Sequence, residues 1–226
     1  VLIPVLGSGR AQEVLLIIDD LMKRGVVKDD VPVYIDGMVW DITAIHTAYP
    51  EFLNNNVRKL IFHKDQNPFL RENFNRVGSK KERMSVIEDE GSCIVMATSG
   101  MLVGGPSVEY LRHLSSNPKN SLIFVSYLGK GSLARRIQEG ISEFSLFAAG
   151  KQEVYPLNMG VNTIAGLTGH AGRKELMNYV YRCNPKPRKV ILNHGESSKT
   201  LDLNTFHHHD KCAHLLTVYL TSNMSD

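Results

Sequence analysis

Short apolar runs separated by longer amphipathic stretches make up most of this chain. The runs carry few charges and are bounded by glycine or polar residues, which is typical of strands buried on both faces of a sheet. They occupy residues 1–6, 31–36, 92–98 and 121–127. Between them, apolar side chains recur every three or four positions, as on the buried face of a helix. Such helices are predicted over residues 10–24, 38–49, 80–88, 106–114 and 132–138.

Strands that alternate with helices predict parallel βαβ units, and therefore an α/β fold with a mostly parallel sheet flanked by helices. The pattern is weaker over residues 54–67, where His63 is expected in a surface loop. Residues 154–157 and 161–167 are expected to form paired strands. The C-terminal part is predicted to hold a helix that ends near residue 182, a strand over 189–193 and a candidate strand over 215–220.

Composition is compatible with one or two globular domains, because the chain has 226 residues of which 42% are hydrophobic. Three widely spaced cysteines, Cys93, Cys183 and Cys212, form no C-x-x-C pair, so we expect reduced thiols in a cytoplasmic protein. No apolar run approaches the roughly 18 residues that span a membrane, and no signal peptide is recognised. The opening run lacks a leading methionine, which suggests a piece of a larger protein.

The net charge is mildly positive, since 26 Lys and Arg face 23 Asp and Glu, a difference of +3. This balance permits nucleic-acid binding without requiring it, because the stronger indication would be a concentrated basic patch. The polar segment formed by His207, His208 and His209 resembles a metal-binding tract. Its contiguous histidines converge poorly on one ion, so a solvated segment is the expectation. Trp40 could stack on a base, but a core position is favoured.

Two histidines stand in short glycine-containing motifs near the end of the chain. His170 lies in Thr-Gly-His-Ala-Gly-Arg and His194 in Ile-Leu-Asn-His-Gly-Glu, each after an apolar run. Both are therefore expected at strand exits, the rim of an α/β sheet where ligands bind. His194 could ligate a metal through one ring nitrogen, and His170 could donate a proton or contact phosphate. The alternative for His194 is a structural histidine at the end of a strand, and the alternative for His170 is a histidine that caps a helix.

Three glycine-containing loops share one design, because each links a predicted strand to a predicted helix. Such turns can present backbone N–H groups to phosphate oxygens, and three of them at one sheet edge suggest a polyphosphate ligand. Two arginines one turn into the following helix could add charge. Glycine used for turn geometry alone is the alternative for each loop. The candidate phosphate-binding residues are Gly7, Ser8, Gly9, Arg10, Ser99, Gly100, Gly104, Gly105, Gly129, Lys130, Gly131, Ser132, Arg135 and Arg136.

Five motifs, in order, resemble the β-CASP branch of the metallo-β-lactamase-fold nucleases. They are VLIPVLGSGRAQEVLL, ATSGMLVGGPSVEY, YLGKGSLARRIQ, LTGHAGRKEL and ILNHGE, which begin at residues 1, 97, 127, 167 and 191. The stretch 31–69 is similar to archaeal homologues of the cleavage and polyadenylation specificity factor that carry KH domains. The resemblance covers about residues 1–196.

This resemblance implies a β-CASP domain over residues 1–167 and the C-terminal segment of a metallo-β-lactamase αββα domain over residues 168–226. It implies two zinc ions in the parent protein, with His194 as a ligand and His170 as the general acid. The glycine loops would line a channel for single-stranded RNA. The H-x-H-x-D-H metal motif and the acidic partner of His170 are absent from this sequence, and Gly172 replaces the usual Asp.

The hypothesis that follows is a zinc-dependent ribonuclease of single-stranded RNA, active in 3′-end processing or transcription termination. This chain, with an incomplete metal site, is expected to be inactive alone. The resemblance suggests transcription machinery and a second copy as partners, and no membrane, although the chain departs from the family from about Ser198, where archaeal members dimerise. The alternatives are a non-catalytic RNA-binding scaffold and, more weakly, a nucleotide-binding domain that uses the loop at Gly7. The latter lacks the G-x-G-x-x-G spacing.

Overall fold

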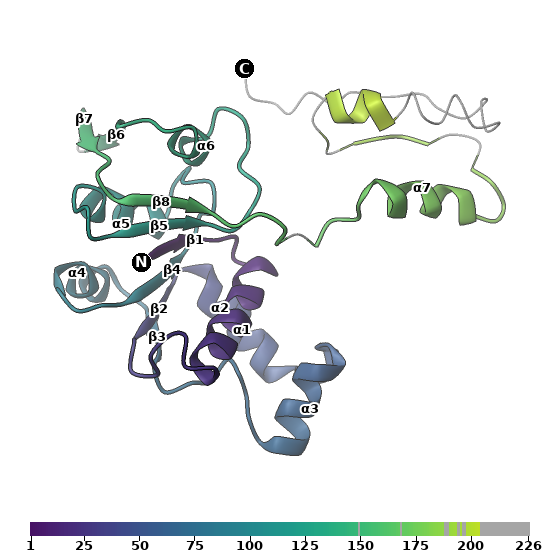
Figure 1. Cartoon of the computed structure of the whole chain (residues 1–226), viewed down its shortest axis with the longest axis horizontal. Coiled ribbons are helices and arrows are strands. Elements are labelled where there is room, and N and C mark those ends of the chain that lie inside the picture. The colour runs from purple at the N-terminus through teal and green to yellow at the C-terminus, as the bar shows by residue number, and fades with distance from the viewer. Residues whose placement is uncertain (149, 168, 188–189, 194, 196–197, 204–226) are drawn as a thin grey trace. The chain divides into compact units, whose positions relative to one another are not determined.

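The chain folds as two compact units, Val1–Thr168 and Gly169–Asp226. The computed structural model describes residues 1–148, 150–167, 169–187, 190–193, 195 and 198–203 (Figure 1). The assignment of residues 1–167 and 168–226 to two domains of the family stays a prediction.

A six-stranded sheet with all strands parallel forms the centre of the first unit. This confirms the predicted α/β fold with a mostly parallel sheet. The strand β1 lies inside the sheet between β4 and β5, so both of its edges are hydrogen-bonded. In spatial order the strands are β3 (Phe74–Val77), β2 (Val33–Asp36), β4 (Ile94–Ala97), β1 (Leu2–Pro4), β5 (Ser121–Phe124) and β8 (Gly160–Thr163).

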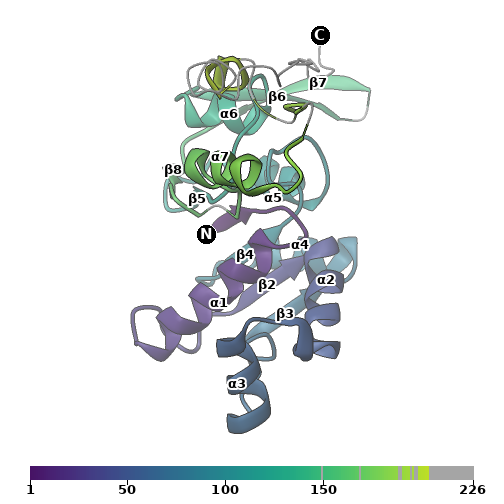
Figure 2. The ribbon, with the colours of Figure 1, turned by 90° about the vertical axis from the view of Figure 1, so that its right-hand side faces the viewer.

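Helices cover both faces of this sheet, because successive strand residues point to opposite sides. Ile3 and Met96 face one apolar cluster, whereas Leu2 and Val95 face the other. The first cluster is covered by α1 (Arg10–Lys23), α2 (Met38–Ala48) and α3 (Asn55–Lys64). The 3-10 helix η1 (Pro50–Phe52) lies between α2 and α3 in the chain. The second cluster is covered by α4 (Lys80–Glu88), α5 (Pro106–Leu114) and α6 (Leu133–Gln138) (Figure 2).

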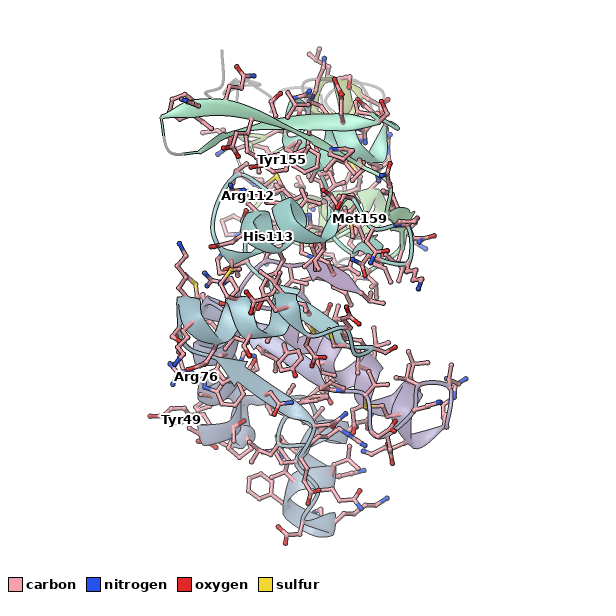
Figure 3. The ribbon with its side chains drawn as sticks, turned by 90° about the vertical axis from the view of Figure 1, so that its left-hand side faces the viewer. Tyr49, Arg76, Arg112, His113, Tyr155 and Met159 are labelled. Atoms are coloured by element: carbon pink, nitrogen blue, oxygen red, sulfur yellow. The ribbon has the colours of Figure 1, made fainter. Side chains whose placement is uncertain are left out.

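A separate hairpin, β6 (Glu143–Ala148) with β7 (Lys151–Pro156), packs beside α5. Arg112 on α5 donates from Nε to the Tyr155 hydroxyl on β7 at 2.6 Å (Figure 3). The expected pairing of residues 154–157 with 161–167 is therefore wrong. β7 pairs antiparallel with β6, and β8 pairs parallel with β5, because the hairpin satisfies β7 locally.

The second unit holds α7 (Arg173–Arg182), as predicted, and a helical stretch at residues 198–203. Arg173 pairs with Asp202 across these two elements. The strand expected over residues 189–193 is wrong where it is described, since Val190 forms a single bridge and residues 191–193 have no regular structure. The candidate strand 215–220 and the histidines 207–209 lie outside the described residues. No helix among the described residues has the length and apolar character needed to cross a bilayer.

Candidate nucleic-acid interface

The three glycine loops emerge at the same edge of the sheet. They follow β4, β1 and β5, which are parallel neighbours in that order, so their carboxyl ends lie side by side. The helices that follow leave this edge toward opposite faces, α1 toward one and α5 and α6 toward the other. In open α/β sheets ligands bind outside the carboxyl ends of strands where connections diverge in this way. We call the loops at 7–10, 98–105 and 128–132 the carboxyl-edge loops.

The first loop is held in place by the buried side chain of Gln12. Its Oε1 accepts from the Gly9 N–H at 2.8 Å, and its Nε2 donates to the Gly7 carbonyl at 3.2 Å and to Thr43 Oγ1 at 3.0 Å. One α1 side chain therefore fixes both glycines and links them to α2. The Gly9 N–H is consequently occupied within the protein.

The neighbouring candidates in this loop are also engaged. Arg10 donates its backbone N–H to the Ser8 carbonyl at 3.1 Å, and its guanidinium pairs with Glu13 one turn along α1. Ser8 is exposed. The N–H groups of Gly9 and Arg10 are therefore not available to phosphate. Phosphate binding at the exposed Ser8 stays a prediction.

The second loop is compact because its own hydroxyl closes it. Ser99 Oγ donates to the Gly104 carbonyl at 3.1 Å and accepts from the Val103 N–H at 3.1 Å. Gly100 lies against the backbone after β1, where an added Cβ would come within 3.2 Å of the backbone nitrogen of Leu6. Here glycine serves close packing of two neighbouring loops, which was the alternative to ligand binding.

Gly105 has φ +78, and a Cβ there would lie 2.9 Å from the Thr98 carbonyl oxygen. Gly104 has open space on its Cα. The N–H groups of Gly104 and Gly105 make no hydrogen bond to another described residue. These two N–H groups are therefore among the backbone donors that this loop can offer to an anion.

The third loop carries Lys130 and leads into α6, which carries Arg135 and Arg136. Ser132 caps α6 by accepting from the Arg135 N–H at 3.2 Å, and it donates to the Gly129 carbonyl at 2.8 Å. Gly131 has φ +84, and a Cβ added there would meet no atom within 4 Å. Glycine is therefore needed at this position for the left-handed backbone conformation and not for close packing. Lys130 is exposed.

The two arginines of α6 differ in their surroundings. Arg135 Nε donates to Glu139 Oε1 at 2.8 Å, and its Nη1 donates to Gln138 Oε1 at 3.1 Å. Arg136 is exposed and makes no ion pair with a described residue. Lys130 and Arg136 are thus the cations of this loop that are available to phosphate, whereas Arg135 is largely satisfied by its own helix.

A buried charge cluster that sequence analysis did not identify lies at the end of β2. Arg83 on α4 bonds the Asp36 carboxylate through Nε and Nη2 at 2.8 and 3.0 Å, and Glu109 Oε2 through Nη1 at 3.2 Å. The Tyr110 hydroxyl donates to Asp36 Oδ2 at 3.1 Å. The available signal was a carboxylate that closes an apolar strand directly before Gly37.

Burial, and then the Asp36 carboxylate, raises the pKa of Tyr110 above its ordinary value. The hydrogen bonds to Asp36 raise the pKa of Arg83. Tyr110 therefore stays a protonated donor and Arg83 a cation, which holds α4 and α5 against the carboxyl end of β2.

Gly37, which follows Asp36 in the chain, lies against the start of the second carboxyl-edge loop. It has φ +79, and a Cβ there would lie 2.6 Å from Thr98 Oγ1. The cluster thus supports the base of the second carboxyl-edge loop.

Exposed apolar side chains accompany the loops. Each of the following residues comes shortly after the end of a strand of the sheet, so all belong to the carboxyl edge. Such side chains can pack against bases or against another domain. They are Leu6, Met38, Val103, Tyr127 and Ile164.

His170 does not lie at a strand exit in the described structure. β8 ends at Thr163, so His170 follows it by seven residues and lies exposed, three residues before α7 begins. The apolar run before His170 continues past the strand as irregular backbone, which the periodicity does not reveal. His194 lies outside the described residues. Their convergence on one site stays a prediction.

The described residues contain no group of three or more His, Cys, Asp or Glu side chains placed to hold a metal ion. The described residues therefore do not by themselves fit a zinc site. Half-buried Cys93 does not alter this, because burial raises the pKa of its thiol and so disfavours the thiolate that binds metal.

Comparison with known families gives two matches. The β-CASP domain model matches residues 11–137, and the model described as the Zn-dependent metallo-hydrolase RNA specificity domain matches residues 154–206. The first match covers more than half of the chain and includes the whole of the second and third carboxyl-edge loops.

Archaeal relatives are similar over most of this chain. The transcription termination factor FttA of Methanocaldococcus jannaschii is 51% identical over 203 residues, 89% of this chain and 32% of that protein. The factor of the same name from Pyrococcus abyssi is 50% identical over 209 residues, and that of Lokiarchaeum sp. is 46% identical over 209 residues. Each of these alignments covers 92% of this chain and 32% of the relative. The chain spans about a third of the length of the curated relatives it matches.

Proposed function

The chain belongs to the β-CASP family, and on that premise we propose that it is the RNA-holding part of a metal-dependent ribonuclease. The substrate is single-stranded RNA, and the role is 3′-end processing or transcription termination in the cytoplasm. The names of the relatives and the RNA specificity domain match support this role. Because the chain corresponds to about a third of those relatives, the activity, the transcription-machinery partners and a dimeric state are proposed for the whole protein.

The observation that carries the proposal is the gathering of the carboxyl-edge loops on three adjacent strands. The edge combines the exposed cations Lys130 and Arg136, the open N–H groups of Gly104 and Gly105, and the exposed ring of Tyr127. Cations and N–H groups bind phosphates, and an aromatic ring stacks on a base whatever its sequence. This chemistry fits a single-stranded RNA better than a compact nucleotide, which would need one glycine loop and an acidic ribose partner.

We assign to the parent protein a zinc site in which His194 is one ligand and His170 supplies a proton to the leaving oxygen. The remaining ligands come from outside this chain. For the parent, His170→Ala should reduce RNA cleavage and spare zinc content, whereas His194→Ala should lower zinc content measured by elemental analysis. If both variants keep full activity, this assignment is wrong.

RNA binding by the edge can be tested on the chain itself. Fluorescence anisotropy with a labelled oligouridine should show that Lys130→Gln with Arg136→Gln raises Kd about tenfold. The slope of log K against log salt should fall by about 1.4, because each single-strand phosphate contact contributes about 0.7. The matched control is Lys81→Gln with Lys119→Gln, which removes the same charge from two exposed residues of α4 and the α5–β5 loop. Equal losses in the two double variants would indicate non-specific attraction.

The ribonuclease hypothesis and the non-catalytic scaffold hypothesis predict different sequences upstream of this chain in its gene. An H-x-H-x-D-H motif there, together with loss of cleavage in the His194→Ala parent, supports the ribonuclease. A replaced motif with intact RNA binding supports the non-catalytic relative.

A further inference from the structure

The helix α3 was not predicted from the sequence, and it leaves a basic face uncovered. Asn54 caps it by accepting from the Asn56 and Val57 N–H groups at 3.0 and 3.1 Å, and Asp65 ends it in the left-handed conformation. Only Val57 is fully buried, with Ile61 packed partly against the first apolar cluster. The helix is therefore anchored along one side and free along the other.

The free side carries an aromatic ring between cations. Arg58 and Lys59 precede Phe62 by four and three residues, which places all three on one helix face. Phe62 is 59% exposed. His63 is exposed beside it, and Asn55 lies two turns earlier on the same face. None of the lysines or arginines of α3 forms an ion pair with a described residue.

The charge of this helix is unusual for the chain. α3 contains Arg58, Lys59 and Lys64 and no Asp or Glu. The whole chain has 26 Lys and Arg against 23 Asp and Glu, so removing three cations leaves 23 against 23. The formal positive excess of the protein is therefore matched by this single helix, whereas elsewhere the opposite charges balance.

A second exposed aromatic residue lies on the neighbouring element. Phe52 ends η1, which packs against α3, and it is 83% exposed. Both views of the ribbon place α3 at the β3 end of the sheet, while α6 and the third carboxyl-edge loop lie at the opposite end (Figures 1 and 2). The surface formed by Arg58, Lys59 and Phe62, here called the α3 face, is thus separate from the carboxyl-edge loops.

We propose that the α3 face is a second contact for single-stranded RNA, with Phe62 stacking on a base and Arg58 and Lys59 binding the flanking phosphates. The proposal rests on the proposed function, because it extends the path of the same RNA. Charge favours RNA over a protein partner, because α3 carries three cations and no Asp or Glu, which suits a phosphate backbone. Stacking on one ring contributes about 1–3 kcal/mol per base without sequence preference.

The test compares RNA affinity and crosslinking in the full chain. Arg58→Gln with Lys59→Gln should weaken binding of an oligouridine of about 30 nucleotides five- to tenfold and reduce the salt slope by about 1.4. Phe62→Ala should weaken it about fivefold or more. Ultraviolet crosslinking followed by mass spectrometry should place uridine on the peptide that contains Phe62, and Phe62→Ala should remove that adduct.

Matched controls separate this surface from the edge. Lys81→Gln with Lys119→Gln controls for charge, and Phe147→Ala, in the exposed tip of the β6–β7 hairpin, controls for loss of an exposed ring. The Lys130→Gln, Arg136→Gln variant should lose affinity and keep the Phe62 adduct. If the edge variant loses affinity and the α3 variants do not, the α3 proposal is overturned and the proposed function stands. If the unaltered chain binds no RNA, both fail.

Discussion

The guanidinium of Arg83 lies across the carboxylate of Asp36 in a two-bond contact, with nitrogen–oxygen distances of 2.8 and 3.0 Å. The side chains are 16% and 2% exposed, so this is a desolvated pair. It joins residues 47 positions apart and connects α4 to the carboxyl end of β2.

Arg83→Met should lower the free energy of unfolding by about 3–5 kcal/mol, because it leaves a buried carboxylate without its partner. Urea denaturation followed by circular dichroism measures this. Arg76→Met is the control: Arg76 and Asp41 are 4.0 Å apart and both exposed, so its loss should cost less than about 0.5 kcal/mol. Similar losses in the two variants would show that the buried pair contributes nothing special.

The raised pKa of Tyr110 predicts a stability change at alkaline pH. Below pH about 10 the ring is protonated in both folded and unfolded chains. Above it, the unfolded chain loses the proton while the folded protein retains it, so stability falls as pH rises, by up to about 1.4 kcal/mol per pH unit. Tyr110→Phe should be less stable at pH 8, having lost the bond to Asp36, and should decline less steeply between pH 10 and 11. Parallel pH curves for the two proteins would contradict this prediction.

Gly37 and Gly104 should respond differently to alanine. Gly37→Ala forces φ +79 on a residue with a Cβ and brings that Cβ to 2.6 Å from Thr98 Oγ1, so a loss of about 2–4 kcal/mol is expected. Gly104→Ala meets open space without a positive φ and should change stability by less than about 0.5 kcal/mol. Thermal unfolding measures both. A neutral Gly37→Ala would mean that the Thr98 contact is absent in solution.

Gln12→Leu should loosen the first carboxyl-edge loop. It removes three hydrogen bonds from a buried position and leaves the Gly9 N–H and Thr43 hydroxyl less satisfied, which should cost about 1–3 kcal/mol. Hydrogen exchange of the Gly9 amide should become faster, and RNA affinity should fall. Thr43→Ser keeps the hydroxyl that Gln12 contacts and serves as the control. Unchanged exchange at Gly9 would show that Gln12 does not fix the loop.

The sheet could be predicted because its central strands are buried on both faces and read as continuous apolar runs. β3 was missed for the opposite reason: it is an edge strand in which Asn75 and Arg76 break the run. α3 was missed because it opens with polar residues and buries only Val57 fully, which leaves no apolar stripe to recognise. Both missed elements thus lack a recognisable apolar pattern, whereas α4, which has no fully buried residue either, could be predicted from its cap at Ser79.

The candidate site was predictable as a set of loops but not in its details. Parallel topology alone brings the loops to one edge. Which glycine packs and which stays open depends on distant neighbours, as Gly37 does on Thr98 and Gly100 on Leu6. The pairing of Asp36 with Arg83 likewise depends on the strand order, in which β2 comes to lie beside β4.

The interior position of β1 has a consequence for biosynthesis. β1 pairs with β4 and β5, whose residues begin 92 and 119 positions after Leu2. During translation at about 5–20 residues per second, this segment must wait several seconds for either neighbour. A nascent chain therefore exposes an unpaired apolar segment until β4 and β5 have been made, and such exposed apolar surface favours aggregation.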